Sequence, residues 1–415
     1  MQRLFYYLFA ILFFLTPLIL WPFTSEVFEF NKMIVTYTLT TLIVAAWAIR
    51  MILEKKIIFR RTILDIPLTG YLVTSLASTI FSVDPRTSWL GYYSRFNGGM
   101  LSLMSYSLLY WAFVSNMDRK NTLKLIVYSL LPGTFLVSVY GVFQHFGIDK
   151  NIWVQDVQNR VFSTLGQPNW LAAFLVALIP LTWTGLVKKS YSYVLPASPA
   201  KLCLSALFFI TLLFTKSRSG LLGFIAADII FWGFAFWQDK KEVLKPFLIH
   251  NLLFVFLFLA IGNPFQSSSF QAPEVSTAPA LETGGTESGE IRKIVWKGAI
   301  EIWKHYPLLG TGPETFAYAY YQFRPVEHNL VSEWDFIYNK AHNEYLNLAA
   351  NTGSVGLLSY LILIFFSVVQ ISKSKQPALL SGYASLLVTN FFGFSVVPTQ
   401  LLLFLFPAIA LTLND

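Results

Sequence analysis

Long apolar segments joined by short polar loops fill most of this chain and decide what it can fold into. Each segment is long enough to cross about 30 Å of hydrocarbon as a helix. The charged fraction of the chain is 13%, well below the roughly 25% of a soluble domain. The sequence therefore predicts an all-α, polytopic membrane protein with about twelve transmembrane helices. The segments cover residues 4–22, 33–53, 63–81, 99–115, 122–143, 169–187, 199–215, 219–237, 246–262, 353–371, 377–393 and 396–413.

The Lys and Arg residues in the short loops predict the orientation of these helices. With the N-terminus in the cytoplasm, the inner segments carry 17 of them and the short outer loops carry 7. Basic residues favour the cytoplasmic side of a membrane, so both termini are predicted to be cytoplasmic. The inner residues are Arg3, Arg50, Lys55, Lys56, Arg60, Arg61, Arg119, Lys120, Lys124, Lys188, Lys189, Lys201, Lys240, Lys241, Lys245, Lys373 and Lys375, and the outer ones are Lys32, Arg86, Arg95, Lys150, Arg160, Lys216 and Arg218.

Three regions follow from this organisation. Residues 1–262 are predicted to form an N-terminal transmembrane bundle of about nine helices, and residues 353–415 contribute about three more. Between the ninth and tenth helices lies one large extracytoplasmic loop, residues 263–352. Its first part, residues 263–289, is rich in Ser, Thr, Pro, Gly and Glu and is predicted to be flexible. Residues 290–352 are rich in aromatic side chains and are predicted to be ordered and partly helical.

Composition excludes several kinds of site. The net charge of +8 comes from loop residues that orient the helices, so nucleic acid is not an expected partner. Cys203 is the sole cysteine, which rules out an intramolecular disulfide and a cysteine-based metal site. The five histidines show no metal-ligand spacing, and no metal or cofactor is predicted. His250 and His305 read as ordinary interfacial or surface residues.

Arg292 lies in a segment, residues 288–306, that reads as a helix capped by Ser288. On such a helix, Arg292 falls opposite a polar stripe, beside Trp296, Ala299 and Trp303. A guanidinium on an apolar face needs an anion, because burying it unpaired costs several kcal/mol. One interpretation is a structural ion pair or stacking on Trp296. The other is a phosphate ligand, which a guanidinium binds with two parallel hydrogen bonds.

Arg218 occupies a tight outer turn, Lys216-Ser217-Arg218-Ser219-Gly220, that opens the next helix. The backbone N–H groups of a helix start, two hydroxyls and two cations favour an anion site. The alternative is that both cations reach toward lipid headgroups.

His342 precedes the helix that re-enters the membrane through Asn351-Thr352-Gly353. An imidazole there can take a proton from a hydroxyl, although a structural role is the commoner one for a lone histidine. Glu344 and Glu314 are the rival bases. Asp228 lies near the centre of the eighth segment, where an acid serves either proton transport or a polar contact between helices.

Four motifs in this order resemble the O-antigen ligase and O-antigen polymerase superfamily of bacterial membrane glycosyltransferases. They are Phe162-Ser163-Thr164-Leu165-Gly166-Gln167-Pro168-Asn169-Trp170-Leu171-Ala172, Ser217-Arg218-Ser219-Gly220, the run from Arg292 through Trp296 to Pro307-Leu308-Leu309-Gly310-Thr311-Gly312, and Ala341-His342-Asn343-Glu344-Tyr345-Leu346 with Gly353 and Gly356. The resemblance covers most of the chain from about residue 80 onward.

The resemblance implies an inverting, metal-independent enzyme that needs no cofactor. Its donor would be a glycan on undecaprenyl diphosphate, and its acceptor a hydroxyl of a glycan, lipid or protein. It would lie in the bacterial cytoplasmic (inner) membrane among membrane lipids, with the active site on the extracytoplasmic side. Arg218 and Arg292 would match the family's arginines, and His342 its essential histidine. Arg95, Asn169 and Glu344 are predicted to be further contacts to the donor or acceptor.

Ligases, polymerases and protein O-oligosaccharyltransferases share these motifs, so the acceptor stays open. Two rivals come from other classes: a transporter of lipid-linked glycans, which Asp228 would suit, and a non-catalytic scaffold of envelope assembly. A transporter commonly shows two related halves. The two halves of this sequence look unrelated, and its polar residues gather at one face, which favours the enzyme.

Overall fold

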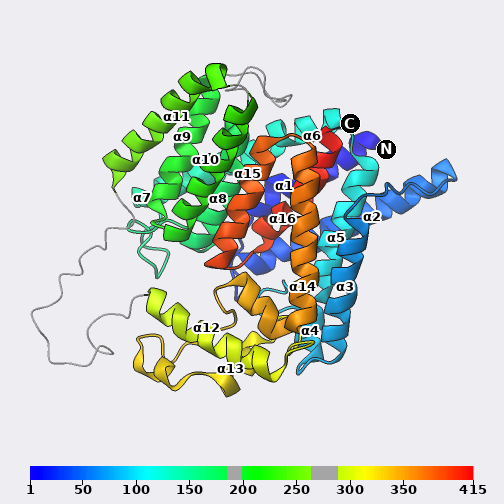
Figure 1. The fold of residues 1–415 in the computed structure, drawn as a ribbon, viewed down its shortest axis with the longest axis vertical. Helices are drawn as coiled ribbons and strands as arrows, with labels where there is room; N and C mark the ends of the chain where they lie inside the picture. The colour runs from blue at the N-terminus through cyan, green and yellow to red at the C-terminus, as the bar shows by residue number, and fades with distance from the viewer. Residues whose placement is uncertain (185–198, 239, 263–287, 415) are drawn as a thin grey trace, which may run out of the picture.

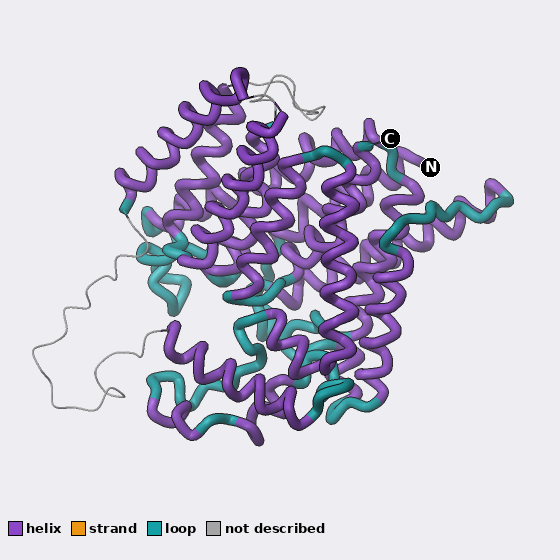
Figure 2. Tube along the Cα trace, in the orientation of Figure 1, coloured by secondary structure: helices purple, strands orange, loops and turns teal. Residues whose placement is uncertain are grey.

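The computed structural model describes residues 1–184, 199–238, 240–262 and 288–414. These residues form helices and loops without a strand, as Figure 2 shows. The predicted flexibility of residues 263–289 falls largely outside the described residues, and Ser288 already begins a helix. The helices are α1 (Gln2–Leu18), α2 (Glu29–Glu54), α3 (Asp65–Ile80), α4 (Pro85–Leu90), α5 (Met100–Asn116), α6 (Arg119–Leu125), α7 (Leu131–His145), α8 (Pro168–Trp183), α9 (Pro199–Phe214), α10 (Arg218–Gln238), α11 (Lys240–Ile261), α12 (Ser288–His305), α13 (Phe316–Phe323), α14 (Glu344–Lys373), α15 (Pro377–Phe391) and α16 (Val397–Leu413).

A helix occupies each of the predicted apolar segments within the described residues. Five helices are long and apolar enough to cross a membrane: Glu29–Glu54, Arg119–His145, Arg218–Trp237, Glu242–Ile261 and Glu344–Lys373. Four further apolar helices are shorter. The all-helical, polytopic character is therefore confirmed, while the number of about twelve crossings stays a prediction.

Helices α8 and α16 form the centre of the bundle. Nearly every described side chain of both helices is buried, as expected for helices that are apolar on all sides. Helix α11 is the opposite case, with most of its apolar side chains exposed at the edge of the bundle (Figure 1). In a membrane protein such a surface faces lipid tails.

A π-helical turn and a glycine break interrupt two of the long helices. Helices α6 and α7 run into one another through a π-helical turn at Ile126–Leu130. Pro132 follows this turn, and its missing N–H explains the widened hydrogen bonding. Helix α14 breaks at Gly353, whose φ of 64° and ψ of −170° are not helical.

The loop before α14 forms a separate small core at one end of the bundle. Helices α12 and α13 lie at this end, and the N- and C-termini lie at the opposite end (Figure 1). Ile291, Val295, Ala299 and Ile302 of α12 pack with Phe316 and Tyr320 of α13. The loop is attached to the bundle by Trp303, whose indole N–H donates to Ser354 Oγ at 3.0 Å, and by Trp296, whose ring meets Phe391 at 5.9 Å. Within residues 290–352 the structure has most of α12 and all of α13.

Candidate active site

The loop run Pro307–Gly312 pairs with the broken turn of α14. The N–H groups of Thr311 and Gly312 donate to the carbonyls of Ala350 and Asn351 at 3.1 and 2.7 Å. The N–H groups of Ser354 and Val355 donate to Pro307 and Leu308 at 2.8 and 3.2 Å. The break at Gly353 frees these groups from the helix, so the third and fourth sequence motifs fold as one unit.

Glycine is required on both sides of this contact. Gly310 and Gly353 both have φ near +65°, a region that only glycine adopts readily. A Cβ on Gly310 would lie 2.3 Å from the Asn351 carbonyl carbon, and one on Gly353 would lie 2.2 Å from the Leu308 carbonyl oxygen. The two backbones therefore approach one another as closely as they can.

His342 lies directly before α14 in a strained conformation. Its φ is 52°, which is uncommon for a residue with a side chain. The next residue, Asn343, caps the helix: its side-chain oxygen accepts from the N–H groups of Tyr345 and Leu346, both at 3.0 Å. Ala341 N–H donates to Asn347 Oδ1 at 3.1 Å. The motif thus holds the imidazole at a helix start. The hydrogen bonds of the neighbouring residues keep His342 in its strained backbone conformation.

The first and second motifs meet beside this histidine. Ser217 Oγ, before the start of α10, donates to Asn169 Oδ1 at the start of α8, at 2.8 Å. Ser217 also lies 3.2 Å from Ser219 Oγ. A Cβ on Gly220 would lie 2.5 Å from Ala172 Cβ, so glycine lets α8 and α10 pack closely here.

One pocket joins three of the four motifs. Its lining includes Asn169 and Trp170 of the first motif, Ser219 of the second and His342 of the fourth. The segment between α15 and α16 closes it with Phe394. We call it the His342 pocket. The residues that line it are Gln167, Asn169, Trp170, Ala173, Ser219, His342, Thr389, Asn390, Phe392, Gly393 and Phe394, none of which is acidic.

Cations surround the imidazole. The Arg95 guanidinium lies 5.1 Å from the Trp170 ring and 5.7 Å from the Phe394 ring. The His342 ring meets Phe394 at 5.5 Å. Burial, followed by the positive charges of Arg292 and Arg95, lowers the pKa of His342 to about 3. The imidazole is therefore neutral at physiological pH, and burial contributes more to this than either of the two positive charges does.

Arg292 lies at the edge of the buried face of α12, as a half-buried residue. The sequence placed it nearer the centre of that face with Trp296, Ala299 and Trp303, of which Ala299 alone is fully buried. Burial lowers the pKa of Arg292, while Tyr338 and Glu333 act in the opposite direction. Arg292 also contributes to a lowered pKa of Arg160. Two guanidiniums therefore lie within electrostatic reach of one another, and the Glu333 carboxylate offsets part of their repulsion.

Arg218 begins α10 as an exposed residue and is not among the residues that line the His342 pocket. Its neighbours Ser217 and Ser219 are buried. The same turn is linked to the preceding loop, because Lys216 donates to Asn159 Oδ1 and Arg160 Nε donates to Thr215 O at 3.1 Å. The structure thus places Arg160 beside the turn that contains Lys216 and Arg218. The sequence did not predict that Arg160 belongs to this group of cations.

Glu344, the remaining predicted contact, faces away from the His342 pocket into a second pocket. It accepts a weak hydrogen bond from Ser395 N–H at 3.4 Å. The rival base Glu314 lines the same second pocket and pairs with Lys340. Neither carboxylate is beside the imidazole.

Asp228 and His250 form a pair that the sequence did not predict. His250 is buried, 1% exposed, so its interpretation as an ordinary interfacial residue was wrong. Its Nε2 lies 3.5 Å from Asp228 Oδ1, and the rings of Trp183 and Trp232 enclose it at 4.7 and 5.2 Å. The contact joins α10 and α11, which accounts for the acid as a polar contact between helices.

Part of the chain resembles a known protein family. Residues 203–361 match the family model described as O-antigen ligase. This segment of the chain is therefore similar to O-antigen ligases. The match includes Arg218, Arg292 and His342 but covers less than half of the chain, and Arg95 and Asn169 lie outside it. None of the curated proteins compared with the chain matches it.

Among the described residues, no three His, Cys, Asp or Glu side chains gather in a way that could hold a metal ion. The His342 pocket and its surroundings instead contain arginines, a neutral imidazole, amides and hydroxyls. Such groups bind phosphate oxygens and exchange protons with hydroxyls.

Proposed function

We propose that this protein transfers a glycan from undecaprenyl diphosphate to an acceptor hydroxyl at the outer face of the cytoplasmic membrane. The observation that carries the proposal is the His342 pocket, in which a neutral imidazole lies among cations and acidic side chains are absent from the lining. The similarity of residues 203–361 to O-antigen ligases supports glycan transfer as the reaction. A metal-independent, inverting reaction is the simplest chemistry for these groups.

The arginines would hold the diphosphate. Arg292 and Arg95 both act on the charge state of His342, so an anion bound between them would lie beside the imidazole. Arg218, on the exposed start of α10, would meet the diphosphate from the membrane side together with the helix N-terminus. Asn169 and Ser219 supply an amide and a hydroxyl to the same pocket. Negative charge grows on the leaving diphosphate, so these contacts stabilise the transition state more than the ground state.

His342 would act as the general base. The acceptor oxygen attacks the anomeric carbon from the side opposite the diphosphate, and the carbon–oxygen bond to the carrier breaks as the new glycosidic bond forms. The hydroxyl proton moves to the imidazole, and undecaprenyl diphosphate leaves with the bonding electrons. Water later removes the proton from His342. The products are an inverted glycoside and the free carrier.

The donor itself would set the basicity of His342. Burial, followed by the charges of Arg292 and Arg95, keeps the pKa of the free imidazole at about 3. A bound diphosphate would offset the two positive charges, and the pKa would rise by their share of the shift. The base would therefore become effective only with the donor in place, which limits proton transfer to the productive complex.

The membrane orientation follows from the same reading. Both termini lie at the end of the bundle opposite α12 and α13 (Figure 1), and the basic short loops predict that this end is cytoplasmic. We infer that residues 1–262 and 353–415 are the two membrane parts and residues 263–352 are extracytoplasmic. Membrane lipids would surround the bundle, and the carrier chain would lie among its helices.

The acceptor separates the members of this group. A polysaccharide polymerase and a protein O-oligosaccharyltransferase would use the same His342 pocket and differ in the hydroxyl that attacks. The transporter alternative loses its main support, because Asp228 has a local partner in His250.

The decisive experiment measures release of free undecaprenyl diphosphate from a lipid-linked oligosaccharide by the purified protein in detergent. We expect release by the wild type with or without EDTA, and none by His342→Ala. His305→Ala is the matched control, since His305 is an exposed histidine on α12. Equal release by His342→Ala would remove this residue as the base. Loss of release with EDTA would contradict the metal-independent reaction. Absence of release by the wild type would contradict the transferase.

A further inference from the structure

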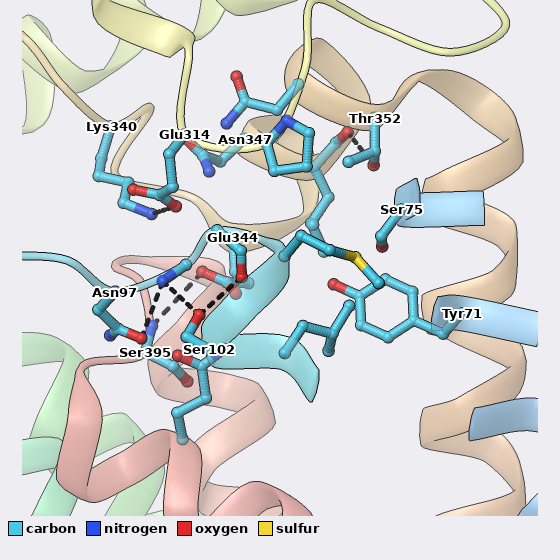
Figure 3. Close-up of a pocket in the computed structure, with 18 residues that line it drawn as sticks. Tyr71, Ser75, Asn97, Ser102, Glu314, Lys340, Glu344, Asn347, Thr352 and Ser395 are labelled. Carbon is cyan, nitrogen blue, oxygen red and sulfur yellow. Dashed lines mark hydrogen bonds and ion pairs between the residues drawn. The ribbon is translucent and has the colours of Figure 1, made fainter. Parts of the chain in front are cut away.

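A second pocket lies on the far side of the residues that carry His342. Figure 3 shows it between α3, the start of α5 and the first half of α14. Its enclosed volume is about 40 Å³, and the space beyond is open to solvent. On α14 its lining consists of Glu344, Asn347, Leu348, Asn351 and Thr352, which is the spacing of one helical face. We call it the Glu344 pocket.

A thin wall separates the two pockets. Along one segment, Lys340 and Glu344 line the Glu344 pocket while His342 lines the His342 pocket. Along the other, Ser395 faces the former and Phe394 the latter. The Phe394 ring lies 5.5 Å from Lys340 Nζ and 5.5 Å from the His342 ring. A molecule in the Glu344 pocket is therefore about one side chain away from the imidazole.

With Glu344 ionised, the two pockets would have opposite charge. Glu314 pairs with Lys340 over the backbone of Gly98, and Glu344 has no equally close cation among the described residues. With both carboxylates ionised the pocket would carry one net negative charge, whereas the His342 pocket lies among Arg95 and Arg292. A diphosphate is repelled from the Glu344 pocket and attracted to its neighbour. Carboxylates do accept hydrogen bonds from hydroxyls.

One polar group in the Glu344 pocket lacks a partner. The side-chain oxygen of Asn351 receives no hydrogen bond from the residues that the structure describes, although Asn351 is only 2% exposed and lines the pocket. Leaving such a group unpaired costs about 1–3 kcal/mol. A ligand with an O–H or N–H group would satisfy it. Asn97, Ser102, Asn347 and Thr352 add further hydrogen-bonding groups, and Tyr71 adds an aromatic surface.

We propose that the Glu344 pocket binds an uncharged sugar of the acceptor, a hexose or N-acetylhexosamine, on the other side of the wall from His342. This inference rests on the proposed glycan transfer. An acceptor sugar carries hydroxyls and no diphosphate, so the carboxylates, amides and hydroxyls of this pocket suit it. The same carboxylates exclude uronic acids and phosphorylated sugars. The donor head and the acceptor are thus sorted by charge between two adjoining pockets.

Binding can be measured without turnover. Saturation-transfer NMR on the purified protein would use four methyl β-glycosides, those of glucose, galactose, N-acetylglucosamine and glucuronic acid, each up to 100 mM. We expect at least one neutral glycoside to bind and the glucuronide to bind at least about tenfold more weakly. Glu344→Gln should weaken binding of the neutral glycoside about tenfold. It should also reduce the difference in affinity between the neutral glycoside and the glucuronide. Glu301→Gln, on the exposed stripe of α12, should change neither.

Three outcomes would overturn the proposal: no neutral glycoside binds, the glucuronide binds as well as the neutral sugars, or Glu344→Gln binds both as the wild type does. Kinetics then separate this pocket from the proposed function. With the best-bound glycoside as acceptor, Glu344→Gln should raise the acceptor KM about tenfold and leave the donor KM within about twofold. A donor KM that rises instead assigns the pocket to donor sugars and overturns the proposal. Absence of carrier release by the wild type would refute the transferase. The NMR measurement would still decide whether the Glu344 pocket binds neutral sugars.

Discussion

The His342 pocket and the Glu344 pocket share a wall yet differ in almost every physical property. The first combines guanidiniums, aromatic rings and a neutral imidazole, and the second combines carboxylates, amides and hydroxyls. The wall can serve both because Lys340 and Glu344 face one pocket and His342, between them, faces the other, with a left-handed backbone at His342. One short segment, residues 340–344, can therefore contribute to a site for an anion and to an adjacent site for a hydroxyl.

The largest expected effect is on the imidazole itself. His342→Ala should reduce turnover by about 10³-fold, within the range for a lost general base, while the donor KM changes little. Single-turnover carrier release measures both. His305→Ala should behave as the wild type. A donor KM that rises with turnover only slightly reduced would show that His342 holds the donor and that another group takes the proton.

Arg292 tests the charge of the first pocket. Arg292→Ala should lower kcat/KM about 100-fold, because a preorganised contact to the leaving group is lost. Arg292→Lys should recover only part of this, since lysine cannot make two parallel hydrogen bonds to phosphate. Steady-state carrier release checks both variants against Lys293→Ala, an exposed neighbour paired with Glu290. Full recovery by lysine would reduce the role of Arg292 to charge alone.

Gly98→Ala should disturb the second pocket and spare the first. Gly98 has φ of +85°, and its Cβ would lie 2.0 Å from Glu314 Oε1. The Glu314 carboxylate must move, and we expect the acceptor KM to rise about tenfold with an unchanged donor KM. Gly70→Ala is the control, because nothing lies within 4 Å of its added Cβ. Equal changes in both KM values would mean that the pockets act as one.

Trp303→Phe should have a small effect on stability. It removes the indole N–H that donates to Ser354 Oγ at 3.0 Å, a bond that contributes about 1 kcal/mol. The melting temperature in detergent should fall slightly, and both KM values should stay as they are. Trp237→Phe, at a position 81% exposed, should leave the melting temperature unchanged. A large loss of activity would show that this bond positions the loop for chemistry.

The smallest expected effect is that of pH on the free enzyme. The pKa of His342 lies at about 3, so the imidazole stays unprotonated above that value, and lowering the pH from 7 to 5 should not protonate it. We expect kcat/KM, which reports the free enzyme, to show no histidine ionisation in this range. In the donor complex the pKa should be higher, so kcat should fall before kcat/KM does. An ionisation near 6.5 in kcat/KM would contradict the cationic surroundings of the imidazole.

Local sequence patterns predicted the helices and their polar faces well. The α12 boundary at Ser288 and the exposed stripe containing Lys293, Lys297 and Lys304 follow from spacing alone. The buried face was misplaced by part of a turn around Arg292, because packing against α13 and α14 decides which edge of an amphipathic helix is covered.

Contacts between distant segments could not be predicted. Phe394 reads as one more apolar residue between two membrane segments, yet it meets Arg95, Trp170, Lys340 and His342. The Ser217–Asn169 hydrogen bond joins residues 48 positions apart. Glu344 was assigned to the donor or acceptor from its place beside His342, and the side it faces depends on a positive φ that spacing does not reveal.

The break at Gly353 also fixes a depth. Beyond it, α14 continues to Lys373 as a helix about 30 Å long, the thickness of the hydrocarbon layer. The backbone pairing with Pro307–Gly312 prevents the glycine from sliding along the bilayer normal independently of the loop. Under the proposed function, the uninterrupted part of α14 would span the hydrocarbon layer and hold the imidazole at the level where the tail of the carrier lipid ends and its phosphates begin.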